Sequence, residues 1–323
     1  MQQRPVQEKS DARPRVVDVI AEGLSLIVTR PWLMLVPILL DVVIWLGVKI
    51  EPSALINELI DLVDDSTIAD TEDVISTMQD LGDSNMTQLA ALFVPSMLSG
   101  GGDADIYQLF DQRIWTPGAG AVVLVGFGLV FIASLLAMVY TVPIANAIIG
   151  RKLSIGGNVA LIVRAWARMI AFIVLCVGAL MAIIVPTAIM SVIFAPLLPL
   201  VTSILMIGAI AALLFFYFVF DAIVIADVGP LKAVRMSVEI VRRNMRAVLG
   251  LVLASLLLTT GIPEIVSGML GSLPGLVLAV LLQAVIATGA TAASMFFFVD
   301  RLRQWQPGLI ELPQTAPAFD LSR

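Results

Sequence analysis

The chain has 323 residues, of which 59% are hydrophobic and 14% are charged, and its mean hydropathy is +1.00. Soluble domains carry about 25% charged residues, so this composition excludes an ordinary soluble protein. The sequence contains no histidine and a single cysteine, Cys176. It therefore excludes a histidine-containing catalytic triad, a histidine-ligated zinc or haem site and an intramolecular disulfide. The formal net charge is −6.

Long apolar runs predict membrane spans. About 20 residues cross the bilayer core as a helix, because only a helix pairs its own backbone polar groups there. Pro196 and Pro199 favour a turn that divides the longest run in two. We expect the first run to be an uncleaved span. Five basic residues lie within the 30 positions before it, and no cleavage site for a signal peptide follows. The six predicted spans lie near residues 31–50, 120–145, 169–192, 199–225, 247–265 and 275–299.

These runs predict an all-α polytopic membrane protein with an acidic external insertion. Three basic interfacial helices are expected at the membrane surface, in the N-terminal segment and near residues 151–168 and 230–246. The predicted parts are a cytoplasmic N-terminus with an interfacial helix (1–30), the first span (31–50), an acidic extracytoplasmic insertion (51–118), a membrane region of five helices (119–300) and a cytoplasmic tail (301–323).

The distribution of charge predicts the orientation of the chain. Of the 19 Lys and Arg residues, 17 lie on one side of the predicted spans, and only Lys49 and Arg113 lie on the other. The insertion 51–118 holds 13 acidic residues and only one basic residue. Positive charge collects on the cytoplasmic side of membrane proteins. We therefore expect both termini in the cytoplasm, in a prokaryotic inner membrane, with the acidic insertion outside.

An internal repeat precedes three of the spans. The pattern I-V-R-x-x-x-R occurs at residues 162–168 and again at 240–246, and a degenerate copy lies at 27–30. Around the last full copy, apolar and charged residues form separate stripes with helical spacing, which is typical of a helix half-buried in a boundary. The apolar stripe is Leu231, Val234, Val238, Val241 and Met245, and the charged stripe is Lys232, Arg235, Glu239, Arg242 and Arg246.

Three short motifs carry a resemblance to a known group. They are RPWL at residues 30–33, KAVRMS at 232–237 and VRRN at 241–244. The chain resembles, over roughly residues 14–300, bacterial six-span proteins related to the membrane domain sometimes fused to glycerophosphodiester phosphodiesterases. In that family the phosphodiesterase is a separate barrel domain, which this sequence has no segment to encode. The resemblance therefore implies a six-span architecture and no defined activity.

Two polar residues lie inside predicted spans near the middle of the bilayer. An aspartate such as Asp41 is costly at that depth, so it indicates either a relay for an ion or proton or a partner inside the bundle. Gln283 in the sixth span is one expected partner of Asp41. Both interpretations of Asp41 stay open.

Two further positions complete the intramembrane candidates. Asp221 lies with Asp227 at the inner end of the fourth span, where we expect pairing with Lys232 or Arg235. Asn146 lies at the inner end of the second span. Together with Asp41 and Gln283, these residues are too few to trace a proton path across the bilayer.

The basic interfacial residues suit anionic lipid headgroups, each adding about 1 kcal/mol near the surface. The same charges also follow from topology alone, and the two explanations are compatible. Because they are spread along the membrane face, we expect no nucleic-acid partner. The candidates are Arg164, Arg168, Lys232, Arg235, Arg242, Arg243 and Arg246.

The insertion 51–118 is expected to form a solvated external cap that docks a protein partner. Residues 86–98 within it are apolar enough to lie on the membrane. Its acidic residues lack the alternating spacing of a calcium loop, so we predict no metal site. No cofactor is predicted either.

The sequence favours a non-enzymatic role as a scaffold, assembly factor or accessory subunit of a membrane complex. The alternative is a transporter or channel for a small molecule or lipid, since internal repeats are common in transporters. An intramembrane enzyme would need paired acids or a nucleophile with a base, and we predict no catalytic residue.

Overall fold

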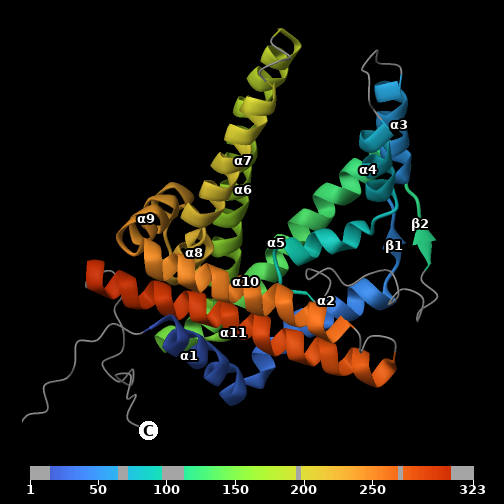
Figure 1. Cartoon of the computed structure of the whole chain (residues 1–323). Helices are drawn as coiled ribbons and strands as arrows, with labels where there is room; N and C mark the ends of the chain where they lie inside the picture. The colour runs from blue at the N-terminus through green and yellow to red at the C-terminus, as the bar shows by residue number, and fades with distance from the viewer. Residues whose placement is uncertain (1–14, 65–71, 97–112, 194–197, 268–271, 307–323) are drawn as a thin grey trace, which may run out of the picture.

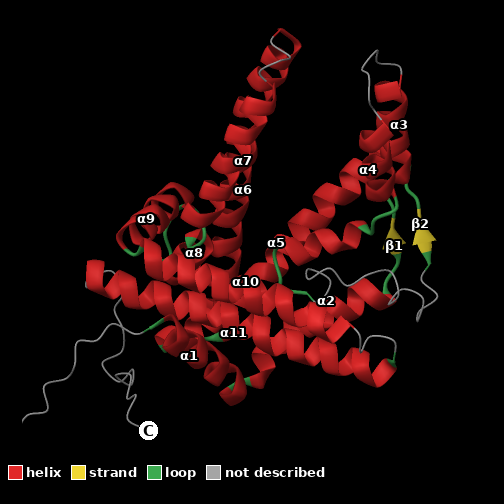
Figure 2. Cartoon of the chain, viewed as in Figure 1, coloured by secondary structure: helices red, strands yellow, loops and turns green. Residues whose placement is uncertain are grey.

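The computed structural model of the chain describes residues 15–64, 72–96, 113–193, 198–267 and 272–306. Almost all of them are helical, and the two short strands pair in parallel (Figure 2), which confirms the all-α prediction. The elements are α1 (Val16–Thr29), η1 (Pro31–Met34), α2 (Leu35–Leu46), β1 (Lys49–Ile50), α3 (Ser53–Asp64), α4 (Glu72–Gly82), η2 (Met86–Leu92), β2 (Ile114–Trp115), α5 (Ala119–Ile149), α6 (Ile155–Ile193), α7 (Leu198–Phe215), α8 (Val219–Ile225), α9 (Pro230–Arg243), α10 (Met245–Ser267) and α11 (Leu273–Trp305).

Five helical segments of the described residues are long and apolar enough to cross a membrane, so the chain is a polytopic membrane protein. They match the last five predicted spans: Ala119–Ile149, Ile155–Thr187, Ser203–Ile225, Met245–Val266 and Leu273–Trp305. The first predicted span differs from them. Pro31–Leu46 passes the same test only together with α1, and the two segments meet at a bend of 100°.

The repeat copies differ in helical continuity. Residues 155–193 form one helix, so the interfacial segment expected near 151–168 is the start of α6 and not a separate element. In the later copy, Asn244 separates α9 from α10, and its side-chain amide donates to the carbonyl oxygen of Ile240 at 3.1 Å. The earlier copy has Trp166 and alanines between its arginines, which continue a helix, whereas Asn favours helix ends.

The helices form a base with two projections (Figure 1). α10, α11 and α1 lie along the base, and α1 packs along α11. α6 and α7 project together on one side, and the α3–α4 hairpin projects on the other. α5 connects these parts by packing against α6, α8 and η2.

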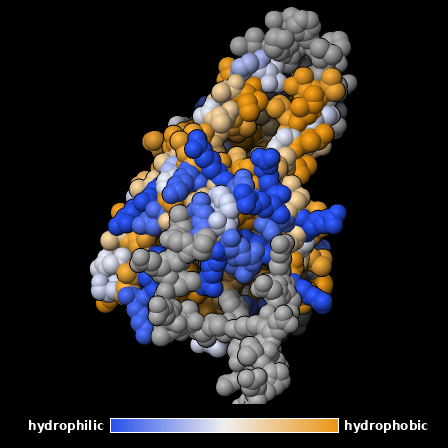
Figure 3. Space-filling view, turned by 90° about the vertical axis from the view of Figure 1, so that its left-hand side faces the viewer, coloured by the Kyte–Doolittle hydropathy of each residue, from blue (hydrophilic) through white to orange (hydrophobic). Residues whose placement is uncertain are grey.

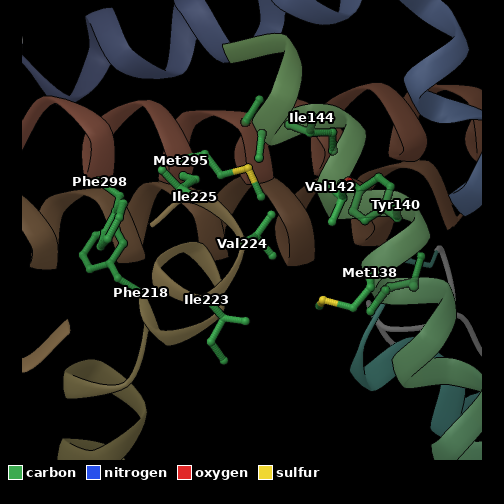
Figure 4. Packing of buried hydrophobic residues seen from close by; sticks show 14 of the residues in the cluster. Met138, Tyr140, Val142, Ile144, Phe218, Ile223, Val224, Ile225, Met295 and Phe298 are labelled. Atoms are coloured by element: carbon green, nitrogen blue, oxygen red, sulfur yellow. The ribbon is translucent and has the colours of Figure 1, made fainter. Parts of the chain in front are cut away.

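Close packing in the base depends on small residues and on one aromatic cluster. Gly23 of α1 lies directly against the backbone of Gly289 on α11. Phe218, fully buried, stacks on Phe297 with ring centroids 5.6 Å apart. Figure 4 shows Phe218 beside Phe298 as well, at the point where α8 meets α11. This cluster fixes the position at which α8 starts.

Candidate ligand-binding cavity

The fourth predicted span is broken near the centre of the molecule. α7 ends at Phe215 and α8 begins at Val219. Ser237 of α9 bridges the break, because its hydroxyl accepts from the N–H of Phe218 at 3.1 Å and donates to the carbonyl oxygen of Phe215 at 2.7 Å. A break inside a membrane is stable only where the protein pairs the freed backbone groups. Ser237 supplies those partners and so stabilises a non-helical segment beside the cavity described next.

A cavity of about 430 Å³ lies against this break, between α5, α6, α8, α10 and α11. Its walls are mainly apolar, and Met138 extends into the space from α5 (Figure 4). Polar side chains from four elements interrupt these walls. They include Tyr140 on α5, Tyr217 and Asp221 at the broken span, Ser255 and Thr259 on α10, and Thr291 and Ser294 on α11.

The polar groups of the cavity bridge neighbouring helices. Ser294 donates its hydroxyl proton to Asp221 Oδ2 at 2.5 Å, joining α11 to α8. The hydroxyl oxygens of Tyr217 and Ser255 lie 3.5 Å apart, at the limit of a hydrogen bond. Tyr140 donates to the Thr291 hydroxyl oxygen at 3.3 Å, joining α5 to α11, and Thr291 itself donates to the backbone carbonyl of Ala287 at 2.9 Å, as hydroxyls in apolar helices commonly do. Ser294 therefore differs in making its bond to a carboxylate.

Part of the predicted external insertion forms one wall of the cavity. Phe93, Val94 and Pro95, which follow η2, line the space, and Val94 is 1% exposed. η2 itself packs on α5. The expectation that this stretch only lies on the membrane is therefore wrong, because its apolar residues enter the bundle. Among the described residues of the insertion, Phe93, Val94 and Pro95 thus belong to the wall of the cavity.

The wall of the cavity formed by α10 lies at the apolar surface of the protein. Leu256 lines the cavity and is 57% exposed, on a helix long and apolar enough to cross a membrane. Leu257 beside it is also exposed. At this position, α10 is the element between the cavity and the apolar surface.

Of the four intramembrane residues singled out from the sequence, only Asp221 lines the cavity. Asp41, 1% exposed, accepts a hydrogen bond from the Ser96 hydroxyl at 2.5 Å. Gln283 donates to the carbonyl oxygen of Thr259 at 3.2 Å, so its expected pairing with Asp41 is not formed. The Asn146 amide donates to the Asn158 side chain at 2.9 Å and ties α5 to α6. This last residue is structural.

The expected pairing of Asp221 and Asp227 with Lys232 or Arg235 is wrong. Asp227 instead holds two residues of the earlier repeat copy: Arg164 at 2.8 Å and Arg168, which also donates to its carboxylate. Asp227 has a positive φ of 50°, a conformation that Asp tolerates better than most side chains. The turn between α8 and α9 therefore presents this carboxylate to α6.

The predicted lipid-binding residues divide into three groups. Arg164 and Arg168 are held by Asp227, and Arg243 bonds Glu239 at 2.5 Å while lying over the ring of Trp305. The other four are exposed and form no ion pair with a described residue: Lys232, Arg235, Arg242 and Arg246. We call these four residues the basic face. Figure 3 shows hydrophilic side chains gathered at the end of the molecule where α9 lies, with apolar flanks on either side.

The side of α9 that packs on the core differs from the apolar stripe expected at the membrane boundary, and only Val241 belongs to both. Leu231 is 64% exposed, and Val234 and Val238 are only partly buried. The side that packs on the core is formed by Ala233, Met236, Ser237, Ile240 and Val241. Small Ala233 and Ser237 allow close approach to the broken span, whereas hydropathy alone favours the larger residues. α9 thus carries a second apolar stripe next to its basic face.

Several cavity residues gave no usable signal in the sequence. Ser255, Thr259, Thr291 and Ser294 are ordinary hydroxyl residues in apolar helices, and only their one-turn spacing within α10 and near-one-turn spacing within α11 set them apart. Comparison of the chain with protein-family models, with curated proteins and with solved structures found no match. The case for a function therefore rests on the geometry of the cavity.

Proposed function

We propose that this protein binds a lipid or another small amphipathic molecule in the intramembrane cavity and carries it as a transporter. The observation behind this proposal is the cavity itself, which adjoins a broken span and has Leu256, an exposed residue of α10, in its wall. Transporter sites commonly form where a spanning helix is interrupted near the bilayer midplane. Mainly apolar walls with a few converging polar groups are typical of sites for small molecules.

The proposal places the protein in a prokaryotic inner membrane with both termini in the cytoplasm, as the charge distribution favours. It also assigns no enzymatic role. Among the described residues that line the cavity, Asp221 has no second acid beside it, as catalysis by paired carboxylates would need. We take the Ser294 hydroxyl as the hydrogen-bond partner that holds this carboxylate.

The test is native mass spectrometry of the tagged protein, purified from its host in nanodiscs. Ala290 is 6% exposed and lines the cavity, so Ala290→Phe fills it with an aromatic ring. We expect wild type to retain a defined molecule that this variant loses. Ala209→Phe adds the same ring to the exposed surface of α7 and should change nothing. Equal retention by wild type and a folded Ala290→Phe variant would refute the proposal.

Anionic lipids at the basic face are a second part of the proposal, and the same spectra separate them from the cavity ligand. Arg242 is exposed and unpaired within the described residues, as expected of a headgroup contact. Arg242→Gln should reduce retained anionic lipid and leave the cavity ligand in place. Ala290→Phe should have the opposite effect.

A scaffold role is the second candidate, favoured by the exposed acidic surface of the α3–α4 hairpin. Glu58 and Asp61 on α3 and Asp80 on α4 are exposed, with Leu81 beside them at 54% exposure. Deleting the insertion would not isolate this role, because Phe93–Pro95 would be lost from the cavity wall as well. Glu58→Lys with Asp80→Lys leaves that wall intact. A stoichiometric partner that wild type retains and this variant loses would favour the scaffold.

A further inference from the structure

The cavity has a charge of only one sign. Among the described residues that line it, Asp221 is the one charged side chain, and no lysine or arginine contributes to the walls. The carboxylate lies deep, since Asp221 is 6% exposed. A buried ionised carboxylate is stable only with a cationic or strongly hydrogen-bonding partner.

The protein does not supply that cation from nearby. In the described part of the chain, Ser294 is the only side chain that donates a hydrogen bond to Asp221. Arg164 and Arg168 are held by Asp227, and Arg151 donates to the carbonyl oxygen of Ile225 at 3.4 Å. A serine hydroxyl satisfies one lone pair of the carboxylate but does not neutralise its charge. The remaining side of Asp221 faces the cavity.

The groups around Asp221 suit a cation. Tyr217 and Phe220 lie within one turn of it along the broken span, and both line the cavity. Aromatic faces attract organic cations, more strongly where water is excluded. The apolar side chains of Met138, Met169 and Leu256 form walls for a hydrocarbon body. An anionic group such as a phosphate would meet the carboxylate with no basic residue to compensate.

We propose that the cavity selects an amphipathic organic cation, a positively charged amine on an apolar body, with Asp221 binding the charge. This inference rests on the proposed function and specifies its substrate class. The amine could belong to a lipid headgroup or to a free hydrophobic molecule. Either source presents the same chemistry to Asp221, so the experiment needs an arm for each.

The experiment measures binding of radiolabelled tetraphenylphosphonium to the full-length protein in phosphatidylglycerol nanodiscs. Tetraphenylborate has nearly the same shape and the opposite charge, so it serves as the matched competitor. We expect saturable binding that unlabelled tetraphenylphosphonium displaces and tetraphenylborate does not. Asp221→Asn should weaken binding by at least about tenfold, because it removes the charged partner and keeps the size. Asp221→Glu, which keeps the charge, should bind more tightly than Asp221→Asn.

Asp300→Asn is the control, since it removes one negative charge from α11 outside the cavity. It should bind as wild type does. Adding to the nanodiscs a two-chain cationic lipid whose headgroup is an amine without a phosphate should weaken probe binding if the natural amine is a lipid headgroup. If only dodecylamine competes, the natural ligand is a free amine. Both results support the cation site.

Two results would overturn the inference. Equal binding by wild type and folded Asp221→Asn would mean that the carboxylate does not act as a charge, as when it carries a proton. Displacement by tetraphenylborate as effective as by the cation would mean that the cavity does not select charge. In either case, a co-purified molecule that is lost in Ala290→Phe would leave the transporter proposal standing. If Ala290→Phe changed neither the retained molecule nor the binding of tetraphenylphosphonium, the proposed function itself would be refuted.

Discussion

Helix α11 and the α6–α7 pair differ in what surrounds them. In the most apolar window of α11, 67% of the residues are buried, against 11% in the windows of α6 and of the α7–α8 span. The mean hydropathies of these windows are similar, at 2.1, 2.8 and 2.5. Hydropathy therefore does not separate a helix inside the protein from one that faces lipid, since both environments are apolar.

Side-chain size distinguishes the contact between α1 and α11 from the exposed α6–α7 pair. The buried residues of α11 include many small ones, such as Ala287, Gly289 and Ala293. The exposed residues of the α6–α7 pair include large ones, such as Leu180, Ile204 and Leu213. Lipid offers no hydrophobic gain to helix association, so helices associate where small residues bring their backbones into contact. A small residue marks the packed side only where a facing backbone lies against it, as at Gly23, since Gly208 on α7 has open space around it.

The largest effect expected from this comparison is at the crossing of α1 and α11. A methyl group on Gly23 would lie 2.2 Å from the carbonyl oxygen of Gly289 and 2.8 Å from the backbone nitrogen of Ala293. Backbone atoms cannot move aside as a flexible side chain can, so Gly23→Ala should cost about 3 kcal/mol or more. The measurement is unfolding by sodium dodecyl sulfate titration in mixed micelles.

Gly208→Ala on α7 is the matched control. A methyl group there meets no atom within 4 Å, so this variant should unfold as wild type does. If both glycine variants unfolded alike, the contrast between the base and the α6–α7 pair would be wrong.

The same contrast explains which parts of the fold the sequence predicted and which it did not. Apolar runs located the last five spans, because their length and low charge depend on the bilayer alone. The bend between α1 and α2 was not predicted, since the hydropathy of a run of residues does not show where the chain changes direction. The buried side of α9 was also missed, because Ala233 and Ser237 pack there for their small size.

Of the residues that line the cavity, the sequence identified Asp221 and did not predict the residues around it. Asp221 was singled out as an acid at the inner end of an apolar run, with pairing to Lys232 or Arg235 expected there. Ser294 and Ser255 were not found, since a serine in an apolar helix usually bonds its own backbone. The wall at Phe93–Pro95 was missed because 13 acids dominate residues 51–118 and favour a solvated loop.

A smaller effect is expected from truncating aromatic rings in the two environments. Phe218 is 0% exposed and contacts the rings of Phe297 and Phe298, whereas Phe127 on α5 is 72% exposed. Phe218→Ala leaves a void in a packed cluster and should cost about 3 kcal/mol. Phe127→Ala should have little effect, since lipid fills the space. The same titration compares them, and a loss in Phe127→Ala as large as in Phe218→Ala would contradict the lipid-facing assignment.

The smallest effect is expected where the α6–α7 pair joins the base. Asp227 binds Arg164 and Arg168 of α6, and its side chain is 32% exposed. Partly solvated ion pairs contribute about 0.2–1 kcal/mol each and weaken as salt screens them. Asp227→Asn should therefore destabilise by about 1 kcal/mol at low salt and by less at high salt. Asn keeps the tolerance for a positive φ, so backbone strain does not enter the comparison.

A double-mutant cycle with Arg168→Gln isolates the pair, since each single variant removes the same contact. If the two losses simply added and did not depend on salt, the ion pair between Asp227 and Arg168 would not contribute to stability. Coupling between the Asp227 and Arg168 variants would mean that this ion pair at the base holds α6 to the core. The exposed part of α6 contacts lipid and does not contribute to that attachment. That result would give the α6–α7 pair a fixed attachment at one end and leave its lipid-facing residues free to vary in sequence.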